Sequence, residues 1–183
     1  MNDFGGLPRW PLAVLPTPLV RAPRLGERLG LDLWIKRDDL TGFGPAGNKA
    51  RALELLMGDA LGSGCNHMIG CGGPASNLCA GLALAAATAG LRCTLVLHGD
   101  ASGPGHLNLA IAAAAGASVL YTGDPNRETV EPMAAEVAAD LTARGERPYV
   151  VPRGGATARS AASFAIAAAE LVAQLPGREA RLV

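Results

Sequence analysis

The chain has 183 residues, of which 49% are hydrophobic and 17% charged, and its formal net charge at pH 7 is zero. Such a length and composition predict a soluble, globular protein that can bury a core of its own. The charges are dispersed, so no basic patch is available to neutralise nucleic-acid phosphates or to hold the chain on a membrane surface, and we expect neither partner.

No targeting segment is expected, because the N-terminal residues lack a basic start followed by an apolar core. The longest apolar run, residues 78–91, is too short and too rich in alanine and glycine to span a bilayer. We therefore expect a cytoplasmic protein whose four cysteines are reduced, since they show no Cys-x-x-Cys spacing. The three histidines lack His-x-x-x-His spacing, so no metal site is predicted.

The N-terminal segment is rich in proline, which fixes an extended backbone and prevents long helices. We expect an arm that lies on the body of the protein, with a short helix over residues 24–29. A strand is predicted over residues 31–35. From Asn48 onwards, apolar residues recur at helical spacing, and Gly62 is expected to end that helix.

Beyond this helix, short apolar strands alternate with helical segments. The expected strands cover residues 67–71, 93–98, 118–122 and 149–152. The expected helices cover residues 76–89, 106–115, 128–144 and 157–175. This alternation implies right-handed βαβ crossovers, so the predicted fold class is α/β, with three layers and a parallel sheet. Residues 180–183 look like the start of a further strand, so we expect another polypeptide to complete the fold.

Lys49 is expected in the first turn of the helix that begins near Asn48. The positive end of the helix dipole disfavours an ammonium group at this position, which favours an amine that can act as a nucleophile. Lys36 is the other lysine of the chain, and arginine supplies the remaining positive charge. Considered alone, Lys49 could also be an ordinary solvated lysine at a helix start.

The segment Gly-Cys-Gly-Gly-Pro-Ala-Ser-Asn, residues 70–77, follows a predicted strand and begins a helix. Its backbone N–H groups and the helix dipole are expected to form an anion-binding site. Ser76 or Asn77 could equally be the helix N-cap, and the local pattern does not separate the two roles.

The same segment also fits the dinucleotide fingerprint Gly-x-Gly-x-x-Ala, and Asp100 follows the next strand, near the position of a ribose-binding acid. A Rossmann-type dinucleotide-binding domain is therefore an alternative. Pro74 inside the turn and the long segment before the first βαβ unit count against it.

Three motifs together resemble one known family. They are Thr-Pro-Leu at residues 17–19, Ile-Lys-Arg-Asp-Asp-Leu-Thr-Gly at residues 35–42, and Gly-Asn-Lys-Ala-Arg-Ala-Leu-Glu at residues 47–54. The sequence resembles the N-terminal half of the D-cysteine desulfhydrase and 1-aminocyclopropane-1-carboxylate deaminase family. These are pyridoxal 5'-phosphate (PLP) enzymes of the tryptophan-synthase-β-like fold, or fold type II.

The resemblance implies three parts of the chain. Residues 1–53 would form the arm and the lysine-bearing part of a large lobe, residues 54–152 a small α/β lobe, and residues 153–183 the return into an incomplete large lobe. The Gly-Gly-Ala-Thr of residues 154–157 resembles the turn at which the family chain returns. The family's glycine-rich phosphate loop and the residue that contacts the pyridine nitrogen have no counterpart in this sequence.

The resemblance also implies residue roles. Lys49 would be linked covalently to PLP, and Asn48 and Asn77 would contact the cofactor, Asn77 through its phenolic oxygen. Lys49 and Ser76 are the implied catalytic residues, with Ser76 at the substrate carboxylate or in proton transfer. Three neighbours depart from the family's Gln, His and Arg, and these are Ala75, Leu78 and Ala80. Each departure is expected to remove a hydrogen-bonding group from the edge of the substrate pocket.

We therefore expect the N-terminal portion or a subunit of a PLP-dependent lyase or deaminase that acts on a small amino acid. The isolated chain is expected to be inactive, and a complementary chain or a second copy would complete the site. The alternative, from a different class, is a truncated non-catalytic relative that serves as an interaction subunit.

Overall fold

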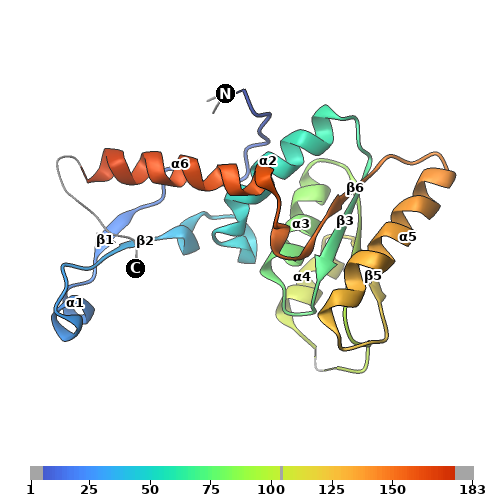
Figure 1. Ribbon diagram of the computed structural model, residues 1–183, viewed down its shortest axis with the longest axis horizontal. Coiled ribbons are helices and arrows are strands. Elements are labelled where there is room, and N and C mark those ends of the chain that lie inside the picture. Colours follow the sequence, from blue (N-terminus) through green and yellow to red (C-terminus); the bar gives the residue numbers. More distant parts are fainter. Residues whose placement is uncertain (1–5, 104, 176–183) are drawn as a thin grey trace.

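The computed structural model describes residues 6–103 and 105–175 (Figure 1). After the N-terminal arm, β1 (Leu19–Arg21) pairs antiparallel with β2 (Trp34–Lys36). Helix α1 (Pro23–Leu29) connects the two strands, where the sequence predicts a short helix. The sequence did not predict β1, and β2 begins at Trp34 rather than at residue 31. Both strands are only three residues long, so little periodic pattern marks them.

Helix α2 (Lys49–Gly62) is the central helix of the protein. It is buried along most of its length, and it packs against two helices that follow later in the chain, α3 (Asn77–Thr88) and α6 (Ala158–Gln174). Two short 3₁₀ helices, Asp38–Leu40 and Gly44–Ala46, lead from β2 to its first turn. The helix ends at Gly62, as predicted.

Four parallel strands form the main sheet, in the order β5-β4-β3-β6. The strands are β3 (His67–Gly72), β4 (Arg92–Leu97), β5 (Ser118–Tyr121) and β6 (Pro148–Val151). A helix follows each strand, namely α3 (Asn77–Thr88), α4 (Leu107–Ala114), α5 (Val130–Ala143) and α6 (Ala158–Gln174). The predicted alternation and the α/β fold class are confirmed, and the bounds of these elements differ from the prediction by at most two residues.

The side chains of β3 alternate between two cores, as the pleat of a strand requires. Ile69 and Cys71 pack with Val130 and Ala134 of α5 on one face of the sheet. Met68 faces the larger core on the other face, to which α2, α3 and α4 contribute. Because every residue of β3 is buried, the strand is covered on both sides, and the predicted three layers are present.

Helix α6 leaves the four-stranded sheet and runs towards β1 and β2, which lie with α1 at the far end of the protein (Figure 1). It packs along α2 on the way. The helix starts with a capping box, in which the Thr157 hydroxyl accepts a hydrogen bond from the Ser160 N–H and the Ser160 hydroxyl accepts one from the Thr157 N–H. The expected division of the chain at residues 53 and 152 stays a prediction.

Arg51 of α2 is the centre of a buried polar cluster, with a relative exposure of 1%. Its guanidinium donates to Asp38 at 2.9 Å, to the Thr17 hydroxyl at 3.0 Å and to Glu170 of α6 at 2.9 Å. Lys36 joins the cluster through an ion pair of 2.6 Å with Glu170. The cluster therefore fixes the arm, the segment after β2 and α6 onto α2.

Glu54 of α2 holds the N-terminal arm in place. One carboxylate oxygen accepts the backbone N–H groups of Leu12 at 2.8 Å and Ala13 at 2.9 Å. The other oxygen pairs with Arg9 at 2.7 Å. Glu54 is 1% exposed, and the arm also crosses Gly58 so closely that a Cβ atom there would overlap the backbone of residue 8. The arm is therefore an integral layer over α2.

The possible strand at residues 180–183 lies outside the described residues. Within residues 6–103 and 105–175, no helix is both long enough and apolar enough to cross a membrane.

Candidate functional site

Lys49 is the first residue of α2, and its side chain is half-buried. Its Nζ atom donates a hydrogen bond to the Gly154 carbonyl oxygen at 3.0 Å. The preceding residue, Asn48, is exposed and makes no capping hydrogen bond with its side chain. The amine of Lys49 is thus held against the backbone of a turn that is distant in sequence, whereas the side chain of Asn48 makes no such contact.

The turn that receives Lys49 is built from two glycines with positive φ angles, 65° at Gly154 and 68° at Gly155. Residues with a Cβ atom rarely adopt this conformation, so the glycines explain the tight return of the chain. Arg153 fixes one side of the turn through Glu131 at 2.7 Å, and Ser160 donates to the Gly155 carbonyl on the other side. The partner of Lys49 is therefore rigidly placed.

The same turn packs against the start of α3. A Cβ atom on Gly155 would lie 3.4 Å from Leu78 Cδ1, and Leu78 directly follows Asn77. Lys49 and the segment with Ser76 and Asn77 are thus connected through a single turn. The Gly154–Gly155 turn thus contacts Lys49 on one side and, on the other, the residue that follows the second motif.

Ser76 is the N-cap of α3, and its Oγ atom accepts the Cys79 backbone N–H at 3.2 Å. The capping role that the local pattern left open is therefore present. Asn77 is exposed, and its Oδ1 atom accepts a hydrogen bond of 2.7 Å from Asn108 of α4. Sequence reasoning missed Asn108, because nothing near it in the chain links it to the turn after β3.

The dinucleotide fingerprint fails on geometry. Gly70 and Gly72 lie inside β3, so they do not form the turn that a dinucleotide phosphate would approach. A Cβ atom on Gly70 would lie 2.7 Å from Leu82 Cδ2, which shows that this glycine serves packing between the strand and α3. Asp100 is exposed and bonded to its neighbour Ser102.

Two of the three departures from the family pattern lie in the interior. Leu78 and Ala80 have relative exposures of 2% and 1%, so they pack in the core. Their burial is contrary to the expectation that both positions border the substrate pocket, because neither side chain faces an open surface. Ala75 alone is exposed.

The cysteines near this site do not provide a nucleophile. All four are free thiols, and burial raises the pKa of Cys71 and of Cys93 to about 12. Burial also raises the pKa of Cys79, although its contact with Ser76 opposes the shift. A protonated, buried thiol is a poor nucleophile. Lys49 is therefore the better candidate for covalent chemistry.

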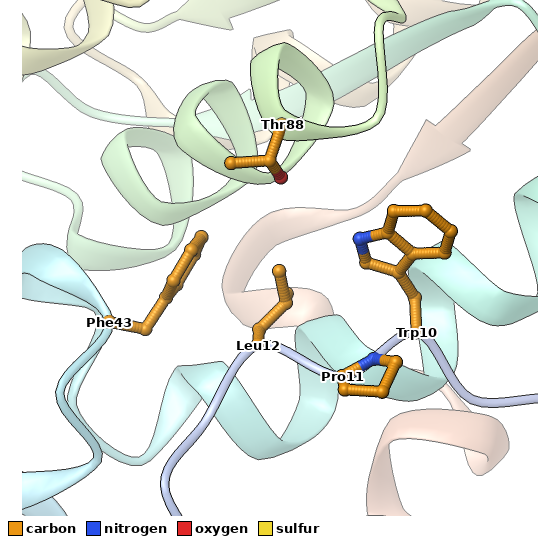
Figure 2. A pocket seen from close by; sticks show the side chains of 5 residues that line it. All are labelled: Trp10, Pro11, Leu12, Phe43 and Thr88. Carbon is orange, nitrogen blue, oxygen red and sulfur yellow. The ribbon is translucent and has the colours of Figure 1, made fainter. Parts of the chain in front are cut away.

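A cavity of about 410 Å³ lies elsewhere, between the N-terminal arm and the end of α3. Trp10, Leu12, Phe43 and Thr88 line it, as Figure 2 shows. Thr88 is the last residue of α3 and Asn77 the first, so the length of the helix, about 17 Å, separates the cavity from the start of α3. The cavity belongs to the packing of the arm rather than to the candidate site.

Comparison with known proteins identifies the family of the chain. Residues 11–183 match the family described as "Pyridoxal-phosphate dependent enzyme". The chain belongs to this family. Its fold is the N-terminal part of fold type II, and the cofactor of the family is PLP, as the resemblance implied.

Relatives with assigned names cover nearly the whole chain. It is 38% identical over 169 residues to the "Putative 1-aminocyclopropane-1-carboxylate deaminase" of Pyrococcus abyssi, which covers 92% of this chain and 50% of that protein. It is 35% identical over 193 residues to the "D-cysteine desulfhydrase" of Klebsiella pneumoniae, which covers 97% of this chain and 55% of that protein. The chain thus spans about half the length of the curated relatives it matches.

Solved structures agree with this assignment. The structure of an "ACC deaminase homologue" superimposes with a TM-score of 0.86 at 35% identity, over 93% of this chain and 52% of that one. A "fungal L-serine ammonia-lyase from Rhizomucor miehei" superimposes with a TM-score of 0.71 at 21% identity, over 91% of this chain and 49% of that one. The second likeness concerns the fold alone.

The residues present fit part of a PLP site. Lys49 offers a primary amine that is hydrogen-bonded to Gly154, and Asn77 offers an exposed carboxamide at the first residue of α3. The aldehyde of PLP needs an amine with which it can form a covalent link, and the phenolic oxygen on its ring needs a hydrogen-bond donor. The roles of Lys49, Ser76, Asn48 and Asn77 towards PLP remain predictions.

Proposed function

We propose that this chain is the lysine-bearing part of a PLP-dependent lyase or deaminase that acts on a small amino acid, D-cysteine or an aminocyclopropane acid. The main support is the position of Lys49, whose amine lies 3.0 Å from the Gly154 carbonyl in the turn that packs on the start of α3. The names of the relatives at 38% and 35% identity support the substrate class.

When bound, PLP supplies the electron sink for a carbanion at the substrate. In the proposal, Lys49 Nζ tethers the cofactor and carries the proton at the substrate α-carbon. The Gly154 carbonyl holds this amine in place through the hydrogen bond that it accepts. Asn77 faces the phenolic oxygen of the ring, and Ser76 contacts the substrate carboxylate. Asn48, which is exposed beside Lys49, completes the cofactor contacts.

We further propose that another polypeptide must cover this chain before the site is complete. Large apolar side chains are exposed on α6 and β2. Their relative exposures are 76% at Val172, 48% at Phe164 and 41% at Ile35. Phe164 and Val172 lie on α6, and Ile35 lies on β2, which pairs only with β1 among the described residues. A two-stranded sheet is marginal on its own, so a further strand or helix would stabilise it.

The deciding experiment traps the proposed link to the cofactor. The purified chain is mixed with PLP and the separately produced C-terminal half of the Pyrococcus abyssi relative, reduced with borohydride and mapped by peptide mass. We expect a pyridoxyl group on Lys49 and none on Lys36, which is bonded to Glu170. Absence of the Lys49 adduct from the assembled complex would refute the function.

Turnover separates an enzyme from a non-catalytic interaction subunit. The assembled complex should consume D-cysteine or an aminocyclopropane acid, and Lys49→Ala should abolish this while the complex still forms. Assembly is followed by size-exclusion chromatography, and Phe164→Ser should weaken it. A complex that assembles and binds PLP yet turns over neither substrate would favour the interaction subunit.

A further inference from the structure

Asn108, the second residue of α4, reaches across to the loop between β3 and α3. Its Nδ2 atom donates one hydrogen bond to the Ala75 carbonyl oxygen at 2.9 Å and another to Asn77 Oδ1 at 2.7 Å. The two bonds use both hydrogens of one amide group. Asn108 therefore binds the backbone and the side chain of the same loop.

These contacts determine which way both carboxamides face. The Ala75 carbonyl can only accept, so the atom of Asn108 that lies against it must be the nitrogen. The same nitrogen lies against Asn77, so the atom of Asn77 that faces it must be the oxygen. An asparagine nitrogen and oxygen are otherwise hard to tell apart, but here a backbone carbonyl settles the assignment.

We infer that Asn108 is a positioning residue that turns Asn77 so that its Nδ2 hydrogens, rather than its oxygen, face the ligand. The inference rests on the proposed function, because the ligand is PLP. The phenolic oxygen of PLP accepts hydrogen bonds, so a donor at Asn77 binds it and an acceptor repels it. Asn108 thus sets the polarity of the loop without touching the cofactor.

The inference can be tested first without any cofactor. Both side-chain amides are observable in the NMR spectrum of the nitrogen-15-labelled chain. We expect the Asn108 amide hydrogens, which are both bonded, to exchange with water at least several-fold more slowly than those of Asn77. Faster exchange at Asn108 than at Asn77 would overturn the assigned orientation.

The second test compares two substitutions by their affinity for PLP. Asn108→Ala releases Asn77, and we expect the Kd for PLP in the assembled complex to rise about tenfold, the effect of one hydrogen bond to a charged group. Asn108→Asp keeps the shape of the side chain, but at neutral pH its carboxylate can only accept hydrogen bonds. Asn77 would therefore turn its nitrogen towards residue 108 and its oxygen towards PLP. We therefore expect Asn108→Asp to bind PLP more weakly than Asn108→Ala.

The order of the two affinities distinguishes positioning from a merely structural role. If Asn108 only supported the fold, the isosteric Asn108→Asp would disturb the protein less than the truncation Asn108→Ala and would bind PLP more tightly. Asn66→Ala is the matched control, since Asn66 also bonds a distant backbone group, the Arg147 N–H at 2.8 Å, but before the start of β3. Its Kd should not change. Asn77→Ala combined with Asn108→Ala should lose no more affinity than Asn77→Ala alone.

Failure of the two proposals can be told apart. If the parent complex forms no Lys49 adduct, the function fails, while the exchange experiment still decides the orientation of Asn77. If the parent forms the adduct but both Asn108 variants bind PLP as the parent does, the function stands and the role of Asn108 is refuted.

Discussion

Arg51 and Glu170 lie 119 positions apart in the sequence, yet the guanidinium of one donates two hydrogen bonds of 2.9 Å to the carboxylate of the other. Arg51 also binds Asp38 and is almost fully buried. Lys49 lies two residues before Arg51 on the same helical turn, so the pair fixes the helix that carries the candidate nucleophile. Arg51, the charged residue next to Lys49 in the motif, thus supports Lys49 by stabilising the fold around its helix.

Replacing Arg51 with Met should destabilise the protein strongly. The substitution removes the buried guanidinium, which leaves Asp38 without its cationic partner and Glu170 paired with Lys36 alone. Breaking a buried ion pair typically costs about 3–5 kcal/mol. The measurement is the free energy of unfolding from urea titration followed by circular dichroism. A loss below about 1 kcal/mol would show that the cluster contributes little.

Arg37→Ala is the matched control for this substitution. Arg37 also pairs with an aspartate, Asp39, at 2.7 Å, but both side chains are exposed. Solvent screens such a pair, so its removal should leave the unfolding midpoint almost unchanged. Equal losses in the two variants would contradict the importance of burial.

Glu170 should give the protein a characteristic sensitivity to acid. Burial alone would raise the pKa of Glu170, but hydrogen bonds from Arg51 and Lys36 outweigh it and lower this pKa from 4.5 to about 2. The folded state therefore binds fewer protons than the unfolded state in this range. The stability contribution, on the order of 3 kcal/mol, is complete above pH 4.5 and is lost as the pH falls towards 2.

The check is the free energy of unfolding as a function of pH for the parent and Glu170→Gln. The variant should be less stable at neutral pH, and its stability should fall less steeply between pH 4.5 and about 2. Parallel curves for the two proteins would show that another group causes the acid response.

The fold was largely predictable because the strands and helices after residue 66 alternate with a clear hydrophobic period. Glycines near the helix ends also marked the bounds. In contrast, β1 depends on pairing between Leu19 and Lys36, a contact across the whole of α1 that no local pattern reveals. The later start of β2, at Trp34 rather than at residue 31, has the same cause. The strand begins only where it can pair with β1.

The two lysines should differ in reactivity towards an amine-directed reagent. Lys36 is bonded to Glu170, to the Thr17 carbonyl and to Gln174, at 2.6 to 2.8 Å. Lys49 has one hydrogen bond, to a carbonyl, and is half-buried. Trace acylation followed by peptide mass spectrometry should modify Lys49 several-fold faster than Lys36. Faster labelling of Lys36 would contradict the arrangement of the buried cluster.

Tyr149 should report on the contact between β6 and α2. Burial, aided by a hydrogen bond of 2.8 Å to Asp59, raises the pKa of Tyr149 to about 12. The raised pKa stabilises the fold below pH 10, and this contribution is lost as the pH rises from 10 towards 12. Tyr149→Phe should cost about 1 kcal/mol at neutral pH, measured by urea unfolding.

An ultraviolet titration of phenolate absorbance supplies the control. The chain has two tyrosines, and Tyr149→Phe should remove the component that titrates near 12. If Tyr121→Phe removed that component instead, the environment assigned to Tyr149 would be wrong.

The site was predictable to the extent that local motifs carry it. Lys49, Ser76 and Asn77 were chosen from sequence and stay predictions, and the structure shows the Gly154–Gly155 turn in contact with Lys49 and with Leu78, the residue after Asn77. Asn108 could not be chosen, because an asparagine near a helix start is common and its two partners belong to another βα unit. The inward direction of Leu78 depends on packing that a motif does not encode.

The attachment of the arm to Glu54 has a consequence for how the protein tolerates trimming. Every hydrogen-bond donor that the described residues offer to this carboxylate comes from Arg9, Leu12 and Ala13. A protease cut or a later translation start that removed these residues would strand a negative charge inside the same helix that carries Lys49. Variation at the N-terminus would thus affect the helix of Lys49 through the interior of the protein.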